Sequence, residues 1–332
     1  MKCSHFHLLC CLSFTLFCFS VCHISAEVPT RPKIVFNSTR DGNTEIYMMD
    51  TDGKQQVRLT HHPDADFQPM WSPTGEQILF VSNRDGVDDL YLMDANGEDV
   101  RRVFKKIASR EQPAWSPDGK QIAYLGNKGN DWAIYIATLD GREERLATCS
   151  RSGGFPAWSP DGTEIVFPKA GLIEKPNPLV IINLHTRRQE ILQPEPQLHM
   201  FRPAWSLDGS TIAFSHVEKL GGKGPVTGTI YTVRRDGANL REIIPEQEQI
   251  SEHPAWSPSG EELAYHRKVG ENWQVFKIDL ASRQNKQLTS RGINVYPNWF
   301  DPAFALPVSP KRQLLTIIWA KMKTSKSMVP TN

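Results

Sequence analysis

The chain has 332 residues, 39% of them hydrophobic, which is enough to bury a core in one large all-β domain or in two smaller domains. Its 38 Lys and Arg residues nearly balance its 37 Asp and Glu residues. No basic stretch interleaved with aromatic residues precedes the C-terminal tail, so the composition does not indicate nucleic-acid binding.

The N-terminal segment differs in composition from the rest of the chain. Lys2 precedes an apolar run from Leu8 to Cys22, and the small residues Ser25 and Ala26 follow it. We interpret residues 1–26 as an export signal peptide that is removed. The alternative is an uncleaved membrane anchor, but the run is shorter than the roughly 20 apolar residues that a spanning helix needs. The mature chain is therefore expected to be periplasmic or secreted, with no membrane span.

Cysteine usage supports a fold without disulfides. Five of the six cysteines lie within residues 1–26, so the mature chain would keep only Cys149. An exported protein with one cysteine has no internal disulfide, and its stability must come from core burial. No His or other base lies near Cys149 at motif spacing, so we interpret it as a turn residue and not as a nucleophile.

An internal repeat runs through the chain after this segment. Six related segments read QPMWSPTG, QPAWSPDG, FPAWSPDG, RPAWSLDG, HPAWSPSG and YPNWFDP. Their tryptophans recur every 43 to 51 residues, at Trp71, Trp115, Trp158, Trp205, Trp256 and Trp299. A period of about 40 to 50 residues with short β-rich runs is typical of propeller blades, each a four-stranded sheet.

Each period contains the signals for four strands. In the repeat that starts at Gln68, a first strand ends at Trp71 and a turn containing Gly75 follows. Alternating or apolar runs then predict strands over residues 77–81 and 90–93, and a more polar fourth strand over 100–104.

The count of strands predicts how the ring closes. Six first-strand segments occur, but the last one, which ends at Trp299, has no second, third or fourth strand after it. The missing strand sequences lie at the other end of the chain, over residues 33–36, 45–49 and 56–59. We therefore predict an all-β, six-bladed β-propeller over residues 27–306, in which N- and C-terminal strands share the closing blade and leave no open sheet edge. Residues 307–332 would form a C-terminal extension with a partly disordered basic tail.

These motifs resemble a known family. The pattern P-x-W-S-P-D-G, then I-A-F or I-L-F, then I-Y-x-M-D and L-T, is similar to the WD40-like repeats of the TolB-type β-propeller family, over about residues 32–300. TolB itself resembles a small α/β domain followed by such a propeller, whereas here the propeller is expected almost directly after the signal peptide. Similar propellers cap prolyl-oligopeptidase-like peptidases, but this sequence has no G-x-S-x-G nucleophile motif.

The repeated aromatic and acidic residues each have two interpretations. The six tryptophans could stack on sugars or peptides, but their fixed place before a turn favours packing between blades. The aspartates of the D-G pairs could bind cations, yet Asp before Gly is also what a tight turn requires, and we favour turn chemistry for Asp118, Asp161 and Asp208. Asp50, Asp94 and Asp279 follow third strands and are expected to cap local turns.

Four histidines suggest an alternative function, that of a metal-dependent enzyme. His61, His62, His199 and His253 lie in connections that lead into first strands, so they could approach one another at one mouth of the ring. Such a group would suit a metal-dependent lyase or hydrolase that acts on a saccharide. Their distances to the next tryptophan differ from blade to blade, which does not indicate one ring of ligands. We therefore expect no catalytic residues, no metal and no cofactor.

One variable position predicts a binding surface. The residue before the repeated proline varies from blade to blade, with five residue types at six positions: Gln68, Gln112, Phe155, Arg202, His253 and Tyr296. If this position lies at the channel mouth, these residues form a partner-binding ring, with Phe155, Arg202 and Tyr296 as anchors. The alternative is that they only pack loops. Longer excursions at 170–178 and 218–229 are further candidate recognition loops. We predict a monomeric scaffold that binds a protein or peptide of the cell envelope.

Overall fold

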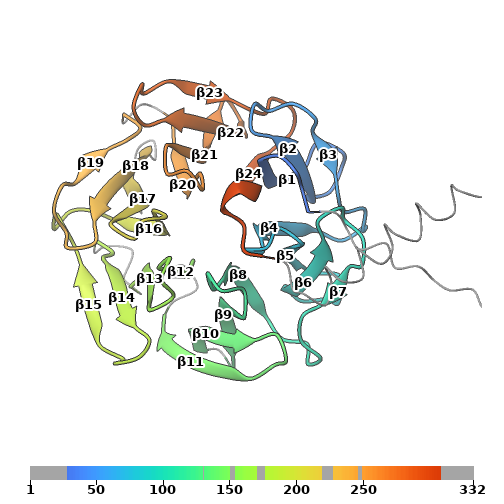
Figure 1. Ribbon diagram of the computed structural model, residues 1–332, viewed down its shortest axis with the longest axis horizontal. Helices are drawn as coiled ribbons and strands as arrows, with labels where there is room; N and C mark the ends of the chain where they lie inside the picture. Colours follow the sequence, from blue (N-terminus) through green and yellow to red (C-terminus); the bar gives the residue numbers. More distant parts are fainter. Residues whose placement is uncertain are drawn as a thin grey trace, which may run out of the picture.

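The computed structural model describes residues 28–129, 131–149, 154–169, 176–218, 227–245 and 249–307. Within these ranges, twenty-four strands form six four-stranded antiparallel sheets, arranged as blades around a central channel (Figure 1). The only helical element in them is a short 3-10 turn, η2 (Pro302–Phe304). The prediction of an all-β, six-bladed propeller is confirmed.

The closing blade joins the two ends of the chain. Its strands, from the channel outward, are β24 (Asn294–Phe300), β1 (Lys33–Ser38), β2 (Glu45–Asp50) and β3 (Val57–Arg58). The innermost strand β24 pairs with β1 in antiparallel register, so that Trp299 lies opposite Ile34. The predicted closure by strands from both ends is therefore confirmed.

The other five blades are each built from consecutive strands, with the first strand innermost (Figure 1). The second blade contains β4 (Asp66–Trp71), β5 (Gln77–Ser82), β6 (Asp89–Asp94) and β7 (Arg101–Arg102). The third contains β8 (Arg110–Trp115), β9 (Gln121–Lys128), β10 (Asp131–Thr138) and β11 (Glu143–Thr148). The fourth contains β12 (Ala157–Trp158), β13 (Glu164–Pro168), β14 (Leu179–Asn183) and β15 (Gln189–Leu192). The fifth contains β16 (Met200–Trp205), β17 (Thr211–Glu218), β18 (Thr227–Arg234) and β19 (Arg241–Glu242). The sixth contains β20 (Ser251–Trp256), β21 (Glu262–Val269), β22 (Asn272–Asp279) and β23 (Asn285–Gln287).

The aspartates of the D-G pairs stabilise the turns between first and second strands. A carboxylate oxygen of Asp118 accepts the backbone N–H of Lys120 at 3.1 Å, and Asp161 accepts that of Thr163 at 3.0 Å. Asp161 also accepts a hydrogen bond from the Ser159 hydroxyl. This bond is the largest cause of the lowered pKa of Asp161, and the bond from the N–H of Thr163 is the next. The side chains thus satisfy turn backbone groups that no strand can pair.

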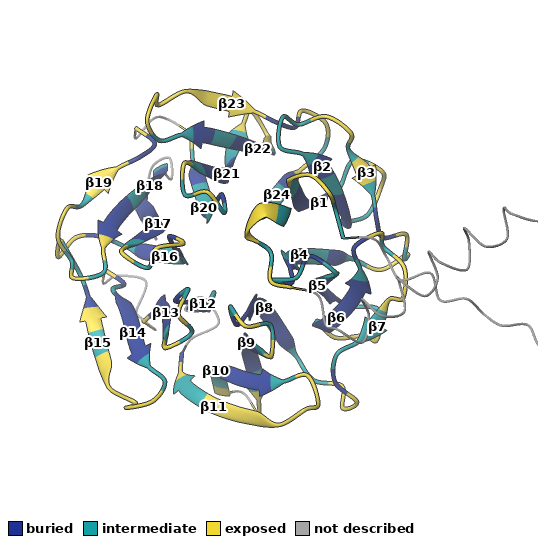
Figure 2. Cartoon of the chain, viewed as in Figure 1, coloured by how far each residue is buried: buried dark blue, intermediate teal, exposed yellow. Residues whose placement is uncertain are grey.

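The hydrophobic core lies between blades. One cluster joins Leu79 and Leu92 of the second blade to Trp115 and Tyr124 of the third, and equivalent clusters occupy the other junctions. Figure 2 shows the consequence: the middle strands are buried, whereas outer strands such as β15 and β23 are largely exposed. Since no blade can bury both of its faces alone, the ring is the stable unit.

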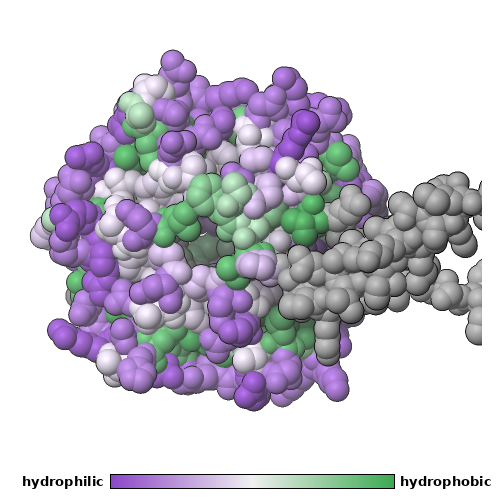
Figure 3. All heavy atoms as spheres, in the orientation of Figure 1, coloured by the Kyte–Doolittle hydropathy of each residue, from purple (hydrophilic) through white to green (hydrophobic). Residues whose placement is uncertain are grey.

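Two predicted segments fall outside the described residues, namely the signal peptide (1–26) and the C-terminal extension beyond residue 307. In the part of the chain that the structure covers, no helix has the length and apolar character needed to cross a membrane. The molecular surface has a hollow at the centre of the ring (Figure 3).

Candidate functional site

The residue before the repeated proline is turned out of the regular strand in every blade. Proline has no N–H to donate to the neighbouring strand, so a first strand cannot pair continuously at this point. Accordingly, the register of β4 with β5 shifts between Phe67 and Met70, and β8, β16, β20 and β24 show the same irregularity. The pre-proline residue adopts a left-handed backbone, with φ between 50° and 62° in all six blades. The bulge directs its side chain toward the channel.

The six pre-proline side chains line one cavity. Gln68, Gln112, Phe155, Arg202, His253 and Tyr296 all border a central cavity of about 260 Å³. The prolines that follow them also line this cavity, as do four of the repeated tryptophans and Asn298. The structure therefore brings together the whole predicted ring, and its role in binding a partner stays a prediction.

Aromatic rings cluster on one side of this cavity. Phe155 of the fourth blade and Tyr296 of the closing blade stack with ring centroids 6.3 Å apart. His253 packs edge-on against both, at 5.4 Å from Phe155 and 4.7 Å from Tyr296. The guanidinium carbon of Arg202 lies 5.3 Å from the centroid of Phe155, in cation–π geometry. Of the three predicted anchors, Phe155 thus packs against both of the others.

An ion pair lies next to this aromatic cluster. Arg202 forms an ion pair with Glu252, and the carboxylate of Glu252 also lies 3.7 Å from the Nε2 atom of His266. Burial, followed by the nearby Arg202, holds the pKa of both His253 and His266 well below the usual 6.5. Both imidazoles are therefore neutral at pH 7, and Nδ1 of His266 accepts the backbone N–H of Tyr296 at 3.4 Å.

The opposite side of the cavity is a chain of amides. The side-chain oxygen of Asn37 accepts the backbone N–H of Gln68 at 3.3 Å. The Oε1 atom of Gln68 accepts the N–H of Gln112 at 2.8 Å, and Oε1 of Gln112 accepts the N–H of Phe155, also at 2.8 Å. Each of these three left-handed residues, Gln68, Gln112 and Phe155, thus has its N–H satisfied by a side chain of the preceding blade. We call Asn37, Gln68, Gln112 and Phe155 the amide relay.

The repeated tryptophans lie at the blade junctions. Five of them are no more than 9% exposed, and Trp256 is half-buried. Three indoles donate to a carbonyl of the preceding blade, Trp158 to Ala114 at 3.2 Å, Trp256 to Ala204 at 3.1 Å and Trp299 to Ala255 at 3.1 Å. Their predicted packing role is consistent with this placement and is testable by substitution.

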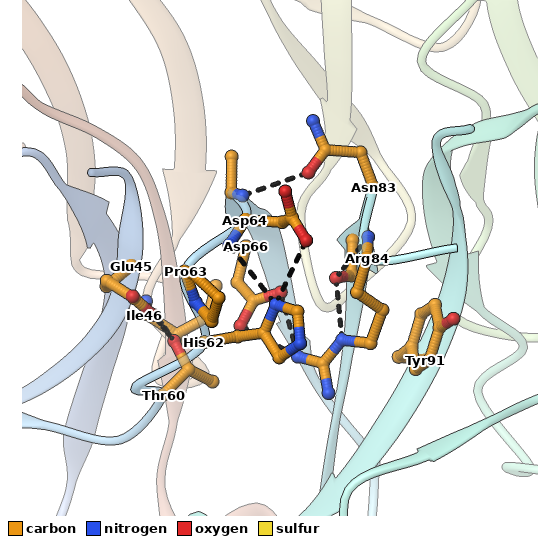
Figure 4. Close-up of polar contacts among 12 residues, drawn as sticks. Glu45, Ile46, Thr60, His62, Pro63, Asp64, Asp66, Asn83, Arg84 and Tyr91 are labelled. Atoms are coloured by element: carbon orange, nitrogen blue, oxygen red, sulfur yellow. Dashed lines mark hydrogen bonds and ion pairs between the residues drawn. The ribbon is translucent and has the colours of Figure 1, made fainter. Parts of the chain in front are cut away.

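The four loop histidines do not form a group. Figure 4 shows His62 beside Asp64, with its Nδ1 atom 3.4 Å from that carboxylate. His61 is exposed, His199 stacks on Phe201, and only His253 reaches the channel. Across the described ranges, no three His, Cys, Asp or Glu side chains gather closely enough to hold a metal ion. The expectation that these four histidines could approach one another is wrong, because they enter the ring at different blades and only His253 lies at the cavity.

Cys149 is equally unsuited to chemistry. Its side chain is buried, and this burial raises the pKa of the thiol to about 12. A thiol in this state supplies almost no thiolate at neutral pH.

Several residues of the site were not expected from the sequence. Asn37, Ser215 and His266 each accept the N–H of a pre-proline residue, and each is the fifth residue of its strand, β1, β17 or β21. Alignment of the second strands could have revealed this position. Glu252 and Gly154 precede pre-proline residues, and no pattern in the sequence marks them. The excursions at 170–178 and 218–229 lie largely outside the described residues.

The chain matches the family model described as the TolB beta propeller domain over residues 22–207. Among solved structures it is similar to TolB from Acinetobacter baumannii, with 20% sequence identity and a TM-score of 0.68. The match covers 80% of this chain and 66% of the TolB chain, so this chain spans just under two thirds of that protein. A protein described as TolB from Agrobacterium tumefaciens gives 19% identity and a TM-score of 0.63 over 80% of this chain and 91% of that one. Hydrazine synthase of Kuenenia stuttgartiensis gives 10% identity and a TM-score of 0.67 over 84% of this chain and 48% of that one. At these identities the likeness concerns the fold alone. No curated protein sequence matches the chain.

Proposed function

The chain belongs to the TolB β-propeller domain family, and we propose that it is a periplasmic or secreted scaffold that catalyses no reaction. In this proposal it binds a peptide or protein of the cell envelope at its channel. Fold membership supports only a rigid ring with loops around a channel. The binding role is inferred from the site itself.

One observation carries the proposal. Five different residue types occupy one equivalent position in the six blades, and in each blade a residue other than glycine is held at positive φ directly before a proline. Such a conformation costs of order 1–3 kcal/mol and persists only where the surroundings enforce it. A shared backbone conformation that places five residue types in one cavity suits recognition better than uniform packing, for which one residue type would serve in all blades.

The size of the cavity indicates how a partner would bind. At about 260 Å³ it falls below the roughly 300–1,000 Å³ of pockets that enclose a drug-sized ligand. It can therefore admit one side chain or a chain end, while the rest of a partner lies over the mouth of the ring. Contacts between Phe155, Arg202 and Tyr296 preorganise this surface, since an aromatic or Arg anchor that is already fixed loses little freedom on binding.

The metal-dependent lyase or hydrolase has no comparable support, since the histidines that motivated it lie apart in the ring.

The proposal is tested with a double variant, Phe155→Ala with Tyr296→Ala. Arg202 is left in place because its removal would leave the carboxylate of Glu252 without its ion-pair partner. The purified protein is used to recover partners from envelope extract, and the dissociation constant of each recovered partner is then measured. Loss of one buried anchor commonly costs 2 kcal/mol or more, about a thirtyfold weakening.

The control for this experiment is Val57→Ala on the exposed outer strand β3, where Val57 is 49% exposed. Both variants are first shown by circular dichroism to be folded. If the folded double variant binds its partner as tightly as the control does, the binding site is not the channel, and the proposal is wrong.

A further inference from the structure

The amide relay fixes which atoms of Gln68 and Gln112 face the cavity. A backbone N–H can only donate, so the side-chain atom that it approaches must be the carbonyl oxygen. The oxygens of Gln68 and Gln112 are each engaged in this way by the N–H of the next blade. Their NH₂ groups must therefore point away from that bond, and both residues line the cavity.

These NH₂ groups are open donors. Within the described part of the chain, no hydrogen-bond acceptor engages the Nε2 atom of Gln68 or of Gln112, and neither atom is among the buried polar atoms that lack a partner. Both are thus accessible from the cavity. They lie on adjacent blades, so two neighbouring primary amides present donors to the same space.

The relay is also held rigidly. A Cβ atom on Gly154 would overlap the Oε1 atom of Gln112, so only glycine leaves room for this side chain to reach the backbone of Phe155. Asn37 anchors the other end of the relay. Donors fixed in advance lose little entropy when a ligand binds.

Among the other polar groups that line the cavity, Arg202 adds a charged donor, whereas neutral His253 and the hydroxyl of Tyr296 can each donate or accept. The carboxylate of Glu252 is taken up by Arg202 and lies next to His266. Arg202 uses one nitrogen for this pair, and the described residues offer no acceptor to its other N–H groups. The cavity thus combines amide donors, a guanidinium and an aromatic cluster. This combination suits a ligand that brings oxygen acceptors and an apolar group side by side.

Building on the proposed function, we propose that the channel binds the C-terminal end of its partner. The terminal carboxylate accepts hydrogen bonds from the NH₂ groups of Gln68 and Gln112. The last side chain of the partner is apolar and packs against Phe155. A free carboxylate is favoured over a neutral carbonyl because it has two acceptor oxygens for two fixed donors and an attraction to Arg202. A chain end, unlike an internal segment, also fits a cavity of about 260 Å³ without threading through it.

Three peptides test this assignment by isothermal titration of the purified protein. They are acetyl-Ala-Ala-Phe with a free carboxylate, the same peptide with a C-terminal amide, and acetyl-Ala-Asp-Phe-amide, whose carboxylate lies on a side chain. We expect the free carboxylate to bind at least tenfold more tightly than either of the others. Equal binding of the first two peptides, equal binding of the first and third, or no binding of any of them would overturn the assignment.

Two variants, Gln68→Glu and Gln112→Glu, test the role of the NH₂ donors. Each keeps an oxygen that can accept the N–H of the next blade and removes the NH₂ donor, so the relay survives while the proposed contact is lost. We expect the free-carboxylate peptide to bind at least tenfold more weakly to each variant. The matched control is Gln121→Glu at the start of β9, outside the cavity, which should change binding less than twofold.

The two proposals fail in different ways. If Phe155→Ala with Tyr296→Ala abolishes partner binding but the acid and amide peptides bind equally, the channel is a docking site that does not read a carboxylate, and only this inference is wrong. If partner binding survives that double variant, the proposed function itself is wrong.

Discussion

The rings of Phe155 and Tyr296 stack across the channel, with centroids 6.3 Å apart and planes inclined by 15°. Phe155 belongs to the fourth blade and Tyr296 to the closing blade, which are opposite members of the ring (Figure 1). This contact links the candidate site to ring closure, because Tyr296 lies on β24, the strand that pairs with β1 to complete the closing blade.

Removal of residues 28–60 should therefore open the ring. The deletion takes away β1, β2 and β3, so β24 loses its partner and Trp299 loses the neighbours Ile34 and Phe36. We expect an insoluble protein, or one whose midpoint of thermal unfolding falls sharply.

A circular permutant is the control for this deletion. Lys33 lies opposite Phe300 in the closing blade, so the two ends can be joined by a short linker. New termini can be placed in the loop at His61, which is exposed. The permutant keeps all four strands of the blade and should unfold close to the wild-type temperature. A deletion variant as stable as the permutant would show that the shared blade does not hold the ring closed.

Most inner strands were predictable from the sequence, whereas the outer strands were less so. The strand expected over 77–81 is β5 (Gln77–Ser82), and the one expected over 90–93 is β6 (Asp89–Asp94). The fourth strand, expected over 100–104, is only β7 (Arg101–Arg102). An outer strand has one neighbour and little buried surface, so its hydrophobic pattern is weak and its ends are poorly specified.

The positions of the site residues could be predicted, but their contacts could not. Alignment of the repeats places Gln68 and Phe155 at equivalent points, and the structure brings both to the channel. Neither sequence segment shows that the side chain of Gln68 accepts the N–H of Gln112, or that the ring of Phe155 stacks on Tyr296. These side-chain directions depend on residues from other blades, such as Asn37, which lie far away in the sequence.

Trp158→Ala tests the packing role of the repeated tryptophans. Trp158 is 8% exposed, packs with Ile165 and Phe167, and donates its indole N–H to the carbonyl of Ala114 in the third blade. Loss of a buried aromatic ring of this kind typically costs about 3–5 kcal/mol. Urea unfolding should show this loss, and Leu207→Ala, at a residue that is 51% exposed, should change stability by less than about 0.5 kcal/mol. A loss below about 1 kcal/mol for Trp158→Ala would point instead to a ligand platform.

The buried histidines should make the protein less stable in mild acid. Burial, and then Arg202, holds the pKa of His253 and His266 well below 6.5 in the folded state. Below about pH 6.5 the unfolded chain binds protons that the folded protein does not, so stability is constant above that pH and falls as the pH decreases toward the folded pKa. The slope between pH 5 and 6 is expected to be about 1 kcal/mol per pH unit for each histidine.

His266→Asn separates this titration from the structural role of the residue. Asn37 occupies the equivalent position in β1 and accepts an N–H in the same way, so an asparagine at position 266 can still accept the N–H of Tyr296. The variant should lose about 1 kcal/mol per pH unit from the slope of its unfolding free energy between pH 5 and 6. An unchanged slope would show that His266 does not resist protonation in the folded protein.

The last prediction concerns Gly154 and the amide relay. In Gly154→Ala, the new methyl group would overlap the Oε1 atom of Gln112, so the glutamine must swing away and leave the N–H of Phe155 without its acceptor. An unsatisfied buried donor costs about 1–3 kcal/mol, to which the overlap adds. Gln112→Ala alone loses the hydrogen bond but removes the closest obstacle. A methyl group at position 154 would then meet the Cδ2 atom of Leu125, at 2.9 Å, so the double variant should be less stable than Gln112→Ala by no more than about 1 kcal/mol. Urea unfolding of the four proteins completes this double-mutant cycle. Strictly additive losses would mean that Gly154 is required for another reason and that the relay does not set the position of Phe155.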